Sequence, residues 1–264
     1  MGTYVLTGSA SGIGAATRSR LEADGHRVIG VDLRNAEVVA DLATTEGRAA
    51  ALAQVKAFCG GSLDGLVPCA GVSVPVPAEL TLQVNWFGTE VFLSGLREEL
   101  AAGDEVSRVV AVSSNSTSIT PNVPEAAVRA LLDMDHATAR DLCGEGLIGS
   151  AVAYATSKTA VARWVRQQAP SAQWAGAGIR LNAIAPGPVQ TPLLQAGIDD
   201  PEAGQMIEGL PMPTGEFGSA ELIAEWITFM LGPAADFMVG SLVFVDGGLD
   251  AMIRPDAWPQ SYEI

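Results

Sequence analysis

Short runs of β-branched and other apolar residues alternate along the chain with longer stretches that have the apolar spacing of helices. The predicted strands cover residues 3–7, 27–32, 36–41, 64–71, 107–114 and 178–186, and "GSLVFVDGG" (240–248) closes the series. The predicted helices cover about 13–24, 46–59, 80–101, 152–170, 192–209 and 219–231. Strands that alternate with helices predict right-handed βαβ units. We therefore expect one α/β domain over residues 1–264, a doubly wound parallel sheet with helices on both faces.

Residues 115–153 interrupt this alternation, because they are too many for a simple loop between a strand and a helix. Apolar residues recur there at helical spacing, at Val128, Leu131, Leu132, Ala139 and Leu142. Pro124 precedes this stretch and Gly144 follows it, as is typical of helix boundaries. We predict an inserted amphipathic helix or helix pair.

The composition excludes several classes of partner. The formal net charge is −15, which argues against nucleic acid or an anionic membrane surface. The longest uncharged run, residues 181–198, contains three prolines and is not a membrane span. Cys59, Cys69 and Cys143 form no Cys-x-x-Cys pair, so we expect no metal site and reduced thiols. With no signal peptide recognisable in "MGTYVLTG", these thiols favour a cytoplasmic protein.

The stretch "TGSASGIG" (7–14) joins a predicted strand to a predicted helix. Gly8 permits the tight turn, Gly12 lets the backbone approach a pyrophosphate, and Gly14 lets the helix pack on the strand. The helix N-terminus offers free N–H groups and partial positive charge to an anion. This pattern predicts a Rossmann-type dinucleotide site, with Ser11 and Ile13 also in the cradle.

Asp32 ends the second predicted strand, twenty residues after Gly12. A carboxylate there accepts hydrogen bonds from the adenosine ribose and repels a 2′-phosphate. Arg34 would favour a 2′-phosphate, but Asp32 holds the strand-end position. We therefore predict NAD rather than NADP as the cofactor, with Leu33 beside Asp32 in the site.

The stretch "AYATSK" (153–158) places Tyr154 and Lys158 four residues apart, on one face of a predicted helix. A free tyrosine has a pKa of about 10, too high for a base near neutrality. A lysine ammonium one turn away favours the phenolate. Tyr154 is therefore the predicted general acid/base.

Six motifs together resemble those of the short-chain dehydrogenases/reductases, in the same order. They are "TGSASGIG", "CAG" (69–71), "NWFG" (85–88), "VSS" (112–114), "YATSK" (154–158) and "PG" (186–187). The resemblance covers essentially the whole chain. It implies hydride transfer between a nicotinamide cofactor and an alcohol or carbonyl, with Tyr154 as the acid/base. It also implies that Ser114 polarises the substrate oxygen, that Lys158 binds the nicotinamide ribose and that Asn85 supports a water-linked proton relay.

The resemblance also implies further cofactor contacts. Asp41 and Leu42 match the pair beside the adenine, and the residues from Pro186 to Thr191 match the loop over the nicotinamide. That loop includes Gly187 and Val189. Cys69, Ala70 and Gly71 stand where the family usually has Asn-Ala-Gly, and a thiol is a poor hydrogen-bonding substitute for an amide.

Several local runs resemble one group within that family, the bacterial 3α-hydroxysteroid dehydrogenases/carbonyl reductases. They include "GIGAATR", "DGLVPCAG", "RLNAIAPG" and "VDGGLDAMIRP", and the group shares the insertion between Ser114 and Tyr154. This likeness implies a hydroxysteroid or another bulky apolar carbonyl as the small-molecule substrate. A coniferyl-type aryl alcohol dehydrogenase is the alternative. A 3-oxoacyl carrier-protein reductase would usually prefer NADP and lack the insertion. A nucleotide-sensing protein without catalysis would tend to lack the tyrosine or the lysine.

The less regular segments are expected to form the substrate pocket, namely the insertion, residues 190–218 and the tail after Gly248. Residues 190–218, rich in Gly and Pro, are the predicted lid. The predicted apolar walls are Leu193, Leu194, Met206, Ile207, Leu210, Met212, Phe217 and Trp258. In much of the family the helices near 80–101 and 152–170 pack between subunits, and a helical insertion beside them would obstruct that packing. We therefore expect a homodimer formed through residues 219–245 rather than a tetramer.

Overall fold

A seven-stranded parallel sheet forms the centre of the computed structural model, which describes residues 1–257. The strand order is β3-β2-β1-β4-β5-β6-β9, and every neighbouring pair is parallel. The strands are β1 (Thr3–Thr7), β2 (Arg27–Asp32), β3 (Val38–Val39), β4 (Gly65–Pro68), β5 (Ser107–Val112), β6 (Ile179–Pro186) and β9 (Leu242–Val245). The order reverses between β1 and β4, which confirms the predicted doubly wound sheet. Trp258 and the residues after it lie outside the described range.

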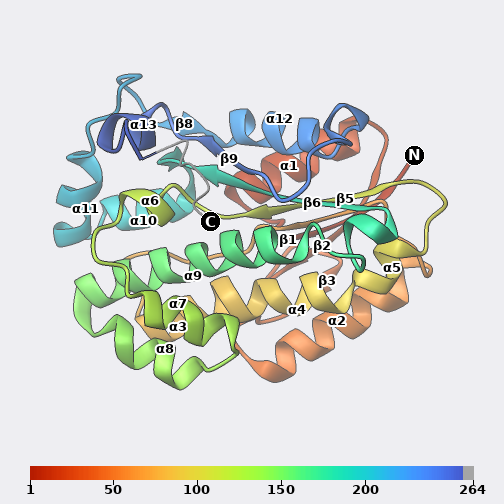
Figure 1. Ribbon diagram of the computed structural model, residues 1–264, viewed down its shortest axis with the longest axis horizontal. Helices are drawn as coiled ribbons and strands as arrows, with labels where there is room; N and C mark the ends of the chain where they lie inside the picture. The colour runs from red at the N-terminus through yellow and green to blue at the C-terminus, as the bar shows by residue number, and fades with distance from the viewer. Residues whose placement is uncertain (258–264) are drawn as a thin grey trace, which may run out of the picture.

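Helices cover both faces of the sheet (Figure 1). On one face lie α1 (Gly12–Ala23) and α12 (Ala220–Met230), and on the other lie α2 (Thr45–Cys59), α4 (Gly88–Gly95) and α9 (Gly146–Gln168). Consecutive residues of a strand pack against the helices on opposite faces of the sheet, because their side chains point alternately to the two faces. Val5 belongs to the core under α2, α4 and α9, whereas Leu6 belongs to the core under α1 and α12. No helix within residues 1–257 is long and apolar enough to cross a bilayer.

The helix expected over residues 80–101 is divided into four shorter pieces. They are α3 (Ala78–Leu82), the π-helical turn η1 (Gln83–Phe87), α4, and α5 (Arg97–Ala101). Asn85 lies at the centre of η1 and is fully buried. The smaller elements are α6 (Ser116–Ile119), η2 (Ala175–Ala177), β7 (Val189–Gln190), α10 (Pro192–Ile198), α11 (Pro201–Glu208), β8 (Gly218–Ser219), η3 (Pro233–Ala235) and α13 (Leu249–Ile253).

Two short helices, α7 (Glu125–Leu132) and α8 (His136–Cys143), lie in the segment between β5 and α9. They pack on the outer side of α3 and α9, away from the sheet (Figure 1). Val128, Leu131 and Ala139 are fully buried there. Leu142 is 43% exposed, although its spacing suggested a buried position. The buried stripe of α8 runs instead through Ala139 and Cys143, four residues apart on one face.

Helix α9 begins at Gly146, six residues before the start expected from the sequence. The last part of the segment 115–153 therefore belongs to the same helix as Tyr154 and Lys158. Side chains of α7 and α8 join the large core cluster together with residues of α9, such as Ala160. The inserted helices are thus packed against the helix that carries the Tyr–Lys pair.

Candidate active site

A cavity of about 850 Å³ opens at the carboxyl ends of the strands. Its walls include the loop after β1, the ends of β2, β4, β5 and β6, and the helices α10 and α11. This place coincides with the reversal of strand order between β1 and β4, where open α/β sheets bind ligands. Every predicted cofactor-binding residue lines the cavity, from Gly8 to Thr191, as do Ser114, Tyr154 and Lys158. Asn85 is buried behind it.

The glycine loop has the shape that a pyrophosphate requires. Gly8 and Gly12 have φ values of +71° and +53°, which side-chain-bearing residues rarely adopt. A Cβ on Gly8 would lie 2.8 Å from the Cα of Ala70, and one on Gly14 would lie 2.0 Å from the Gly8 oxygen. Ser11 precedes α1 but makes no side-chain cap, so the first N–H groups of the helix face the cavity without a local acceptor. These residues fit an anionic diphosphate at the helix N-terminus.

Asp32 is held at the mouth of the cavity by two backbone hydrogen bonds. Its Oδ2 accepts from the Ala10 N–H at 2.9 Å, and its Oδ1 accepts from the Leu33 N–H at 2.7 Å. Each carboxylate oxygen keeps a second lone pair. The side chain is therefore oriented to accept hydrogen bonds from neighbouring hydroxyls, as the sequence predicted for a ribose.

Ser114 and Tyr154 meet at the end of β5. The Ser114 Oγ accepts a hydrogen bond from the Ser116 N–H at 3.1 Å, which leaves the hydroxyl proton of Ser114 available to another oxygen. Burial raises the pKa of Tyr154 above its ordinary value, and a hydrogen bond with Ser114 partly opposes this rise. Ser113, the other serine at this strand end, donates instead to the Lys158 carbonyl at 2.9 Å. Ser114 is thus the serine whose hydroxyl faces the tyrosine.

Lys158 is buried on the inner side of Tyr154. Its Nζ donates to the Val112 carbonyl at 2.9 Å and lies 5.8 Å from the centre of the Tyr154 ring. Burial lowers the pKa of Lys158 to about 8. The sequence predicts that Lys158, together with an oxidised nicotinamide, favours the phenolate of Tyr154, whereas in the protein alone burial of the phenol raises its pKa. The pair is side by side as predicted, and desolvation acts on both members.

Asn85 acts on the backbone next to the cavity. Its Oδ1 accepts from the Val72 N–H at 2.8 Å, and its Nδ2 donates to the Val72 carbonyl at 2.9 Å. The oxygen and the nitrogen of the amide are therefore both hydrogen-bonded. These two bonds hold the loop after β4 against η1. The side chain fixes Val72 and the adjoining Gly71, whose added Cβ would lie 3.3 Å from the Asn85 Oδ1.

Cys69 occupies the position after β4 at which the family usually has an asparagine. Burial raises the pKa of its thiol to about 11, so the thiol is neutral near pH 7. Thr7 supports this loop, because its Oγ1 accepts from the N–H groups of Cys69 and Ala70 at 3.1 and 3.0 Å. Within residues 1–257, no three His, Cys, Asp or Glu side chains gather in a way that could hold a metal ion.

The far end of the cavity is apolar. Of the predicted wall residues, Leu193, Leu194, Met206, Ile207 and Leu210 line it, whereas Met212 and Phe217 do not. Trp258 lies outside the described residues. Ile119 and Ala151 also line the cavity, as expected of the insertion 115–153. The sequence reasoning missed the rest of the wall, which includes Val72, Val74, Leu80 and Val84. Val72 and Val74 lie in the loop after β4, so the rule that ligands bind beyond strand ends could have found them.

Comparison with known proteins agrees with this geometry. Residues 8–250 match the family model described as Enoyl-(Acyl carrier protein) reductase. The chain is 42% identical to the 3-alpha-hydroxysteroid dehydrogenase/carbonyl reductase of Comamonas testosteroni, over 97% of this chain and 99% of that protein. It is 32% identical to the cis-4-hydroxycyclohexanecarboxylate dehydrogenase of Sinomonas cyclohexanicum, over 94% of this chain and 96% of that protein.

A solved structure extends the likeness to three dimensions. The 3-alpha-hydroxysteroid dehydrogenase from Pseudomonas sp. B-0831, complexed with NADH, superposes with a TM-score of 0.90 and 43% sequence identity. The match covers 96% of this chain and 99% of that chain. Fold, motif order and these matches agree, and the chain belongs to the short-chain dehydrogenase/reductase family of oxidoreductases.

Proposed function

We propose that the protein is an NAD-dependent dehydrogenase that interconverts a secondary alcohol and a ketone on a hydroxysteroid or another bulky apolar molecule. The observation that carries this proposal is the meeting of Ser114, Tyr154 and Lys158 between the glycine loop and an apolar wall. The named activity of the Comamonas testosteroni relative supports the substrate class. The NADH complex of the Pseudomonas structure supports the cofactor.

The cofactor fits the residues described above. The glycine loop and the start of α1 would hold the pyrophosphate, Asp32 the adenosine ribose, and Lys158 the nicotinamide ribose. NAD, when bound, supplies the acceptor for hydride, or the donor in the reverse direction. Asp41 and Leu42 line the cavity near Asp32, where the adenine would lie.

The protein's own residues handle the proton. Because burial raises the pKa of Tyr154, its hydroxyl is protonated at neutral pH and can donate to a carbonyl oxygen. The hydroxyl proton of Ser114, which the bond from the Ser116 N–H does not use, would be donated to the same oxygen when substrate is bound. Donation of its proton leaves Tyr154 as a phenolate, and Lys158, with a pKa of about 8, is charged at neutral pH and stabilises it. In the oxidative direction the Tyr154 proton leaves first, and the phenolate oxygen then takes the proton of the alcohol. Asn85 would support the water-linked relay by which that proton leaves.

We further propose that two segments of the single domain form opposite sides of the substrate cavity. Residues 190–218, which include α10 and α11, form a lid that orders over the substrate. Leu193, Met206 and Ile207 of this segment line the cavity and would contact an apolar ring system. The insertion 115–153 braces the other side, through Ile119 in the cavity wall and through the packing of α7 and α8 on α9.

We propose a homodimer formed through α12 and β9. Leu222, Trp226 and Phe229 expose 60%, 44% and 49% of their surface on α12, and β9 is the last strand of the sheet. The helices α7 and α8 cover the outside of α9, so this surface is not open to a second copy. In sedimentation, wild-type protein should have the mass of two chains, and Trp226→Glu the mass of one. A mass of four chains would contradict the proposal. The three free thiols favour a reducing cytoplasm as the place of action.

The functional proposal is tested by reduction of NAD with three alcohols side by side: a 3α-hydroxysteroid, its 3β epimer and coniferyl alcohol. Turnover of the 3α epimer supports the steroid assignment, and turnover of coniferyl alcohol alone would move the protein to aryl alcohols. Tyr154→Phe should lower turnover by about 10²- to 10⁴-fold while NAD binding, measured by calorimetry, stays within about twofold. A phenylalanine variant that retains turnover would refute the role of Tyr154.

A further inference from the structure

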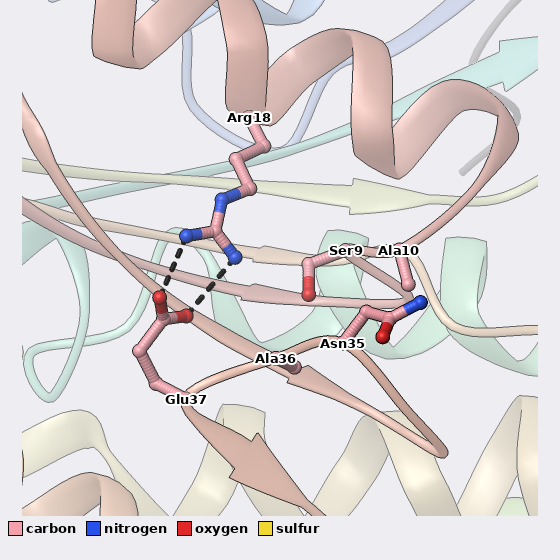
Figure 2. A pocket seen from close by; sticks show the side chains of 6 residues that line it. All are labelled: Ser9, Ala10, Arg18, Asn35, Ala36 and Glu37. Carbon is pink, nitrogen blue, oxygen red and sulfur yellow. Dashed lines mark hydrogen bonds and ion pairs between the residues drawn. The ribbon is translucent and has the colours of Figure 1, made fainter.

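A second, shallower pocket of about 490 Å³ opens between α1 and the loop after β2 (Figure 2). It is lined by Ser9, Ala10, Arg18, Asn35, Ala36 and Glu37. Ala10 also lines the large cavity, so the two spaces adjoin at the glycine loop. None of the functions described above uses Arg18 or Glu37.

The cationic group of this pocket, the Arg18 guanidinium, is paired with the carboxylate of Glu37. The Arg18 Nη1 and Nη2 donate to the two oxygens of Glu37 at 3.0 and 2.6 Å, as Figure 2 shows. The Arg18 Nε donates to Glu22 at 2.8 Å. Glu37 is itself anchored, because its Oε2 also accepts from the Gly30 N–H at 2.8 Å. Arg18 therefore has the paired N–H groups that suit a phosphate, and Glu37 takes both.

An unpaired hydroxyl faces the same point. Ser9 is 2% exposed, and its Oγ has no hydrogen-bond partner among the described residues. A Cβ added to Gly30 would lie 2.4 Å from the Ser9 Oγ and 2.8 Å from the Arg18 Nη1. The hydroxyl and the guanidinium thus converge over Gly30, in space that only a glycine leaves free. A buried donor without an acceptor marks a place where an acceptor would be stabilised.

The position of this point relative to Asp32 is set by β2. Gly30 and Asp32 are two residues apart on one strand, so they share a face and lie about 7 Å apart. Asp32 is the residue proposed to hold the adenosine ribose, and its Oδ2 is bonded to Ala10, at the boundary of the two spaces. The pocket formed by Ser9, Arg18 and Glu37 therefore adjoins the place proposed for the ribose.

We propose that this pocket is a 2′-phosphate subsite closed by Glu37, and that Glu37 is a specificity-determining residue against 2′-phosphorylated cofactors in addition to Asp32. This inference rests on the proposed use of NAD. The Glu37 carboxylate cancels the charge of Arg18 and would itself lie against the incoming phosphate, so the phosphate meets repulsion instead of a paired guanidinium. Removal of that one charge should turn the pocket into an anion site.

The test is Glu37→Gln, because glutamine keeps an acceptor for the Gly30 N–H and loses only the charge. The probes are AMP and adenosine 2′,5′-bisphosphate, which differ only in the 2′-phosphate, and calorimetry measures the dissociation constant of each. Glu37→Gln should improve the affinity for the bisphosphate relative to AMP by about tenfold, the size of one charge-assisted hydrogen bond. Glu22→Gln is the matched control, because Glu22 also bonds Arg18 but does not line the pocket, and it should leave the ratio within about twofold.

Two further variants complete the test. The double variant Arg18→Gln/Glu37→Gln should lose the gain, and a gain that persists would overturn the role of Arg18. If Glu37→Gln does not fold, Arg18→Gln is the test. The negative charge of Glu37 is then no longer neutralised by Arg18, and it should weaken binding of the bisphosphate relative to AMP. An unchanged or higher ratio would overturn the proposal. Wild-type protein that binds neither NAD nor AMP would instead refute the proposed function. If NAD binds but Glu37→Gln leaves the affinity for the bisphosphate relative to AMP unchanged, only this inference is refuted.

Discussion

Lys158 offers a direct measurement of what burial costs at the centre of the site. The chain has two lysines, Lys56 and Lys158, so each can be replaced separately by methionine. Lys158 is 4% exposed, and burial lowers its pKa from 10.5 to about 8. Below about pH 8 the lysine is charged in both the folded and the unfolded chain, and the folded state carries the full cost of the buried charge. Between about pH 8 and 10.5 only the unfolded chain keeps the proton.

The sign and size of the effect follow from that difference. The unfolded state binds more protons in this window, so the free energy of unfolding contributed by Lys158 rises with pH. A pKa difference of about 2.5 corresponds to about 3 kcal/mol, because one pKa unit is about 1.36 kcal/mol. About 2.5 kcal/mol of this change falls between pH 7 and pH 10. Lys158→Met removes the titration, and the lost hydrogen bond to Val112 lowers its stability by a constant amount at every pH.

Urea denaturation at several pH values between about 7 and 10 measures the prediction. The free energy of unfolding of wild-type protein minus that of Lys158→Met should rise by about 2.5 kcal/mol over this range. Tyr154 titrates in both proteins and cancels in the difference, and Cys69→Ala in both backgrounds removes the thiol that interacts with Lys158. Lys56→Met is the control, because the Lys56 side chain is 37% exposed and paired with Glu99 at the surface. Parallel curves for wild type and Lys158→Met would show that the folded protein keeps the proton, and would refute the burial argument.

The remaining predictions test packing, the glycine loop and the serine. Leu131→Ala should lower the free energy of unfolding by about 2–5 kcal/mol, whereas Leu142→Ala should cost under about 0.5 kcal/mol in the same urea assay; equal losses would contradict the observed burial. Gly14→Ala should abolish NAD binding in calorimetry or prevent folding, because its Cβ would lie 2.0 Å from a backbone oxygen of Gly8. Ser114→Ala should lower kcat by about a hundredfold with NAD affinity retained, and an unchanged kcat in steady-state assays would exclude Ser114 from the reaction.

Much of the site could be predicted because its signals are local in the chain. The glycine positions of residues 7–14 follow from backbone conformation, and positive φ values are found at Gly8 and Gly12. Asp32 follows from its place at a strand end. Tyr154 and Lys158 share a helix face because they are four residues apart, and no distant contact is needed for that. The alternation of strands and helices likewise predicted the sheet, since a parallel neighbour requires a crossover.

Other features depended on what packs from distant parts of the chain. The exposure of Leu142 depends on which side of α8 packs against α9. The apolar spacing of the sequence was compatible with more than one buried side. Met212 and Phe217 resemble the wall residues in type, but the path of the segment after α11 keeps them out of the cavity. The pairing of Arg18 with Glu37 joins α1 to the loop after β2, across 19 positions of sequence.

The electrostatic state of the catalytic pair shows the same limit most clearly. The sequence by itself determined that a phenol and an ammonium group lie side by side, since helix geometry decides it. It suggested that Lys158 and an oxidised nicotinamide lower the pKa of Tyr154, whereas burial in the protein alone raises it. Desolvation depends on every atom around a group, and the neighbours of Tyr154 include Cys69 and Ser114 from other parts of the chain. Local spacing therefore determined which groups meet, and only the tertiary structure decided how far water is excluded from them and thus which protons they hold.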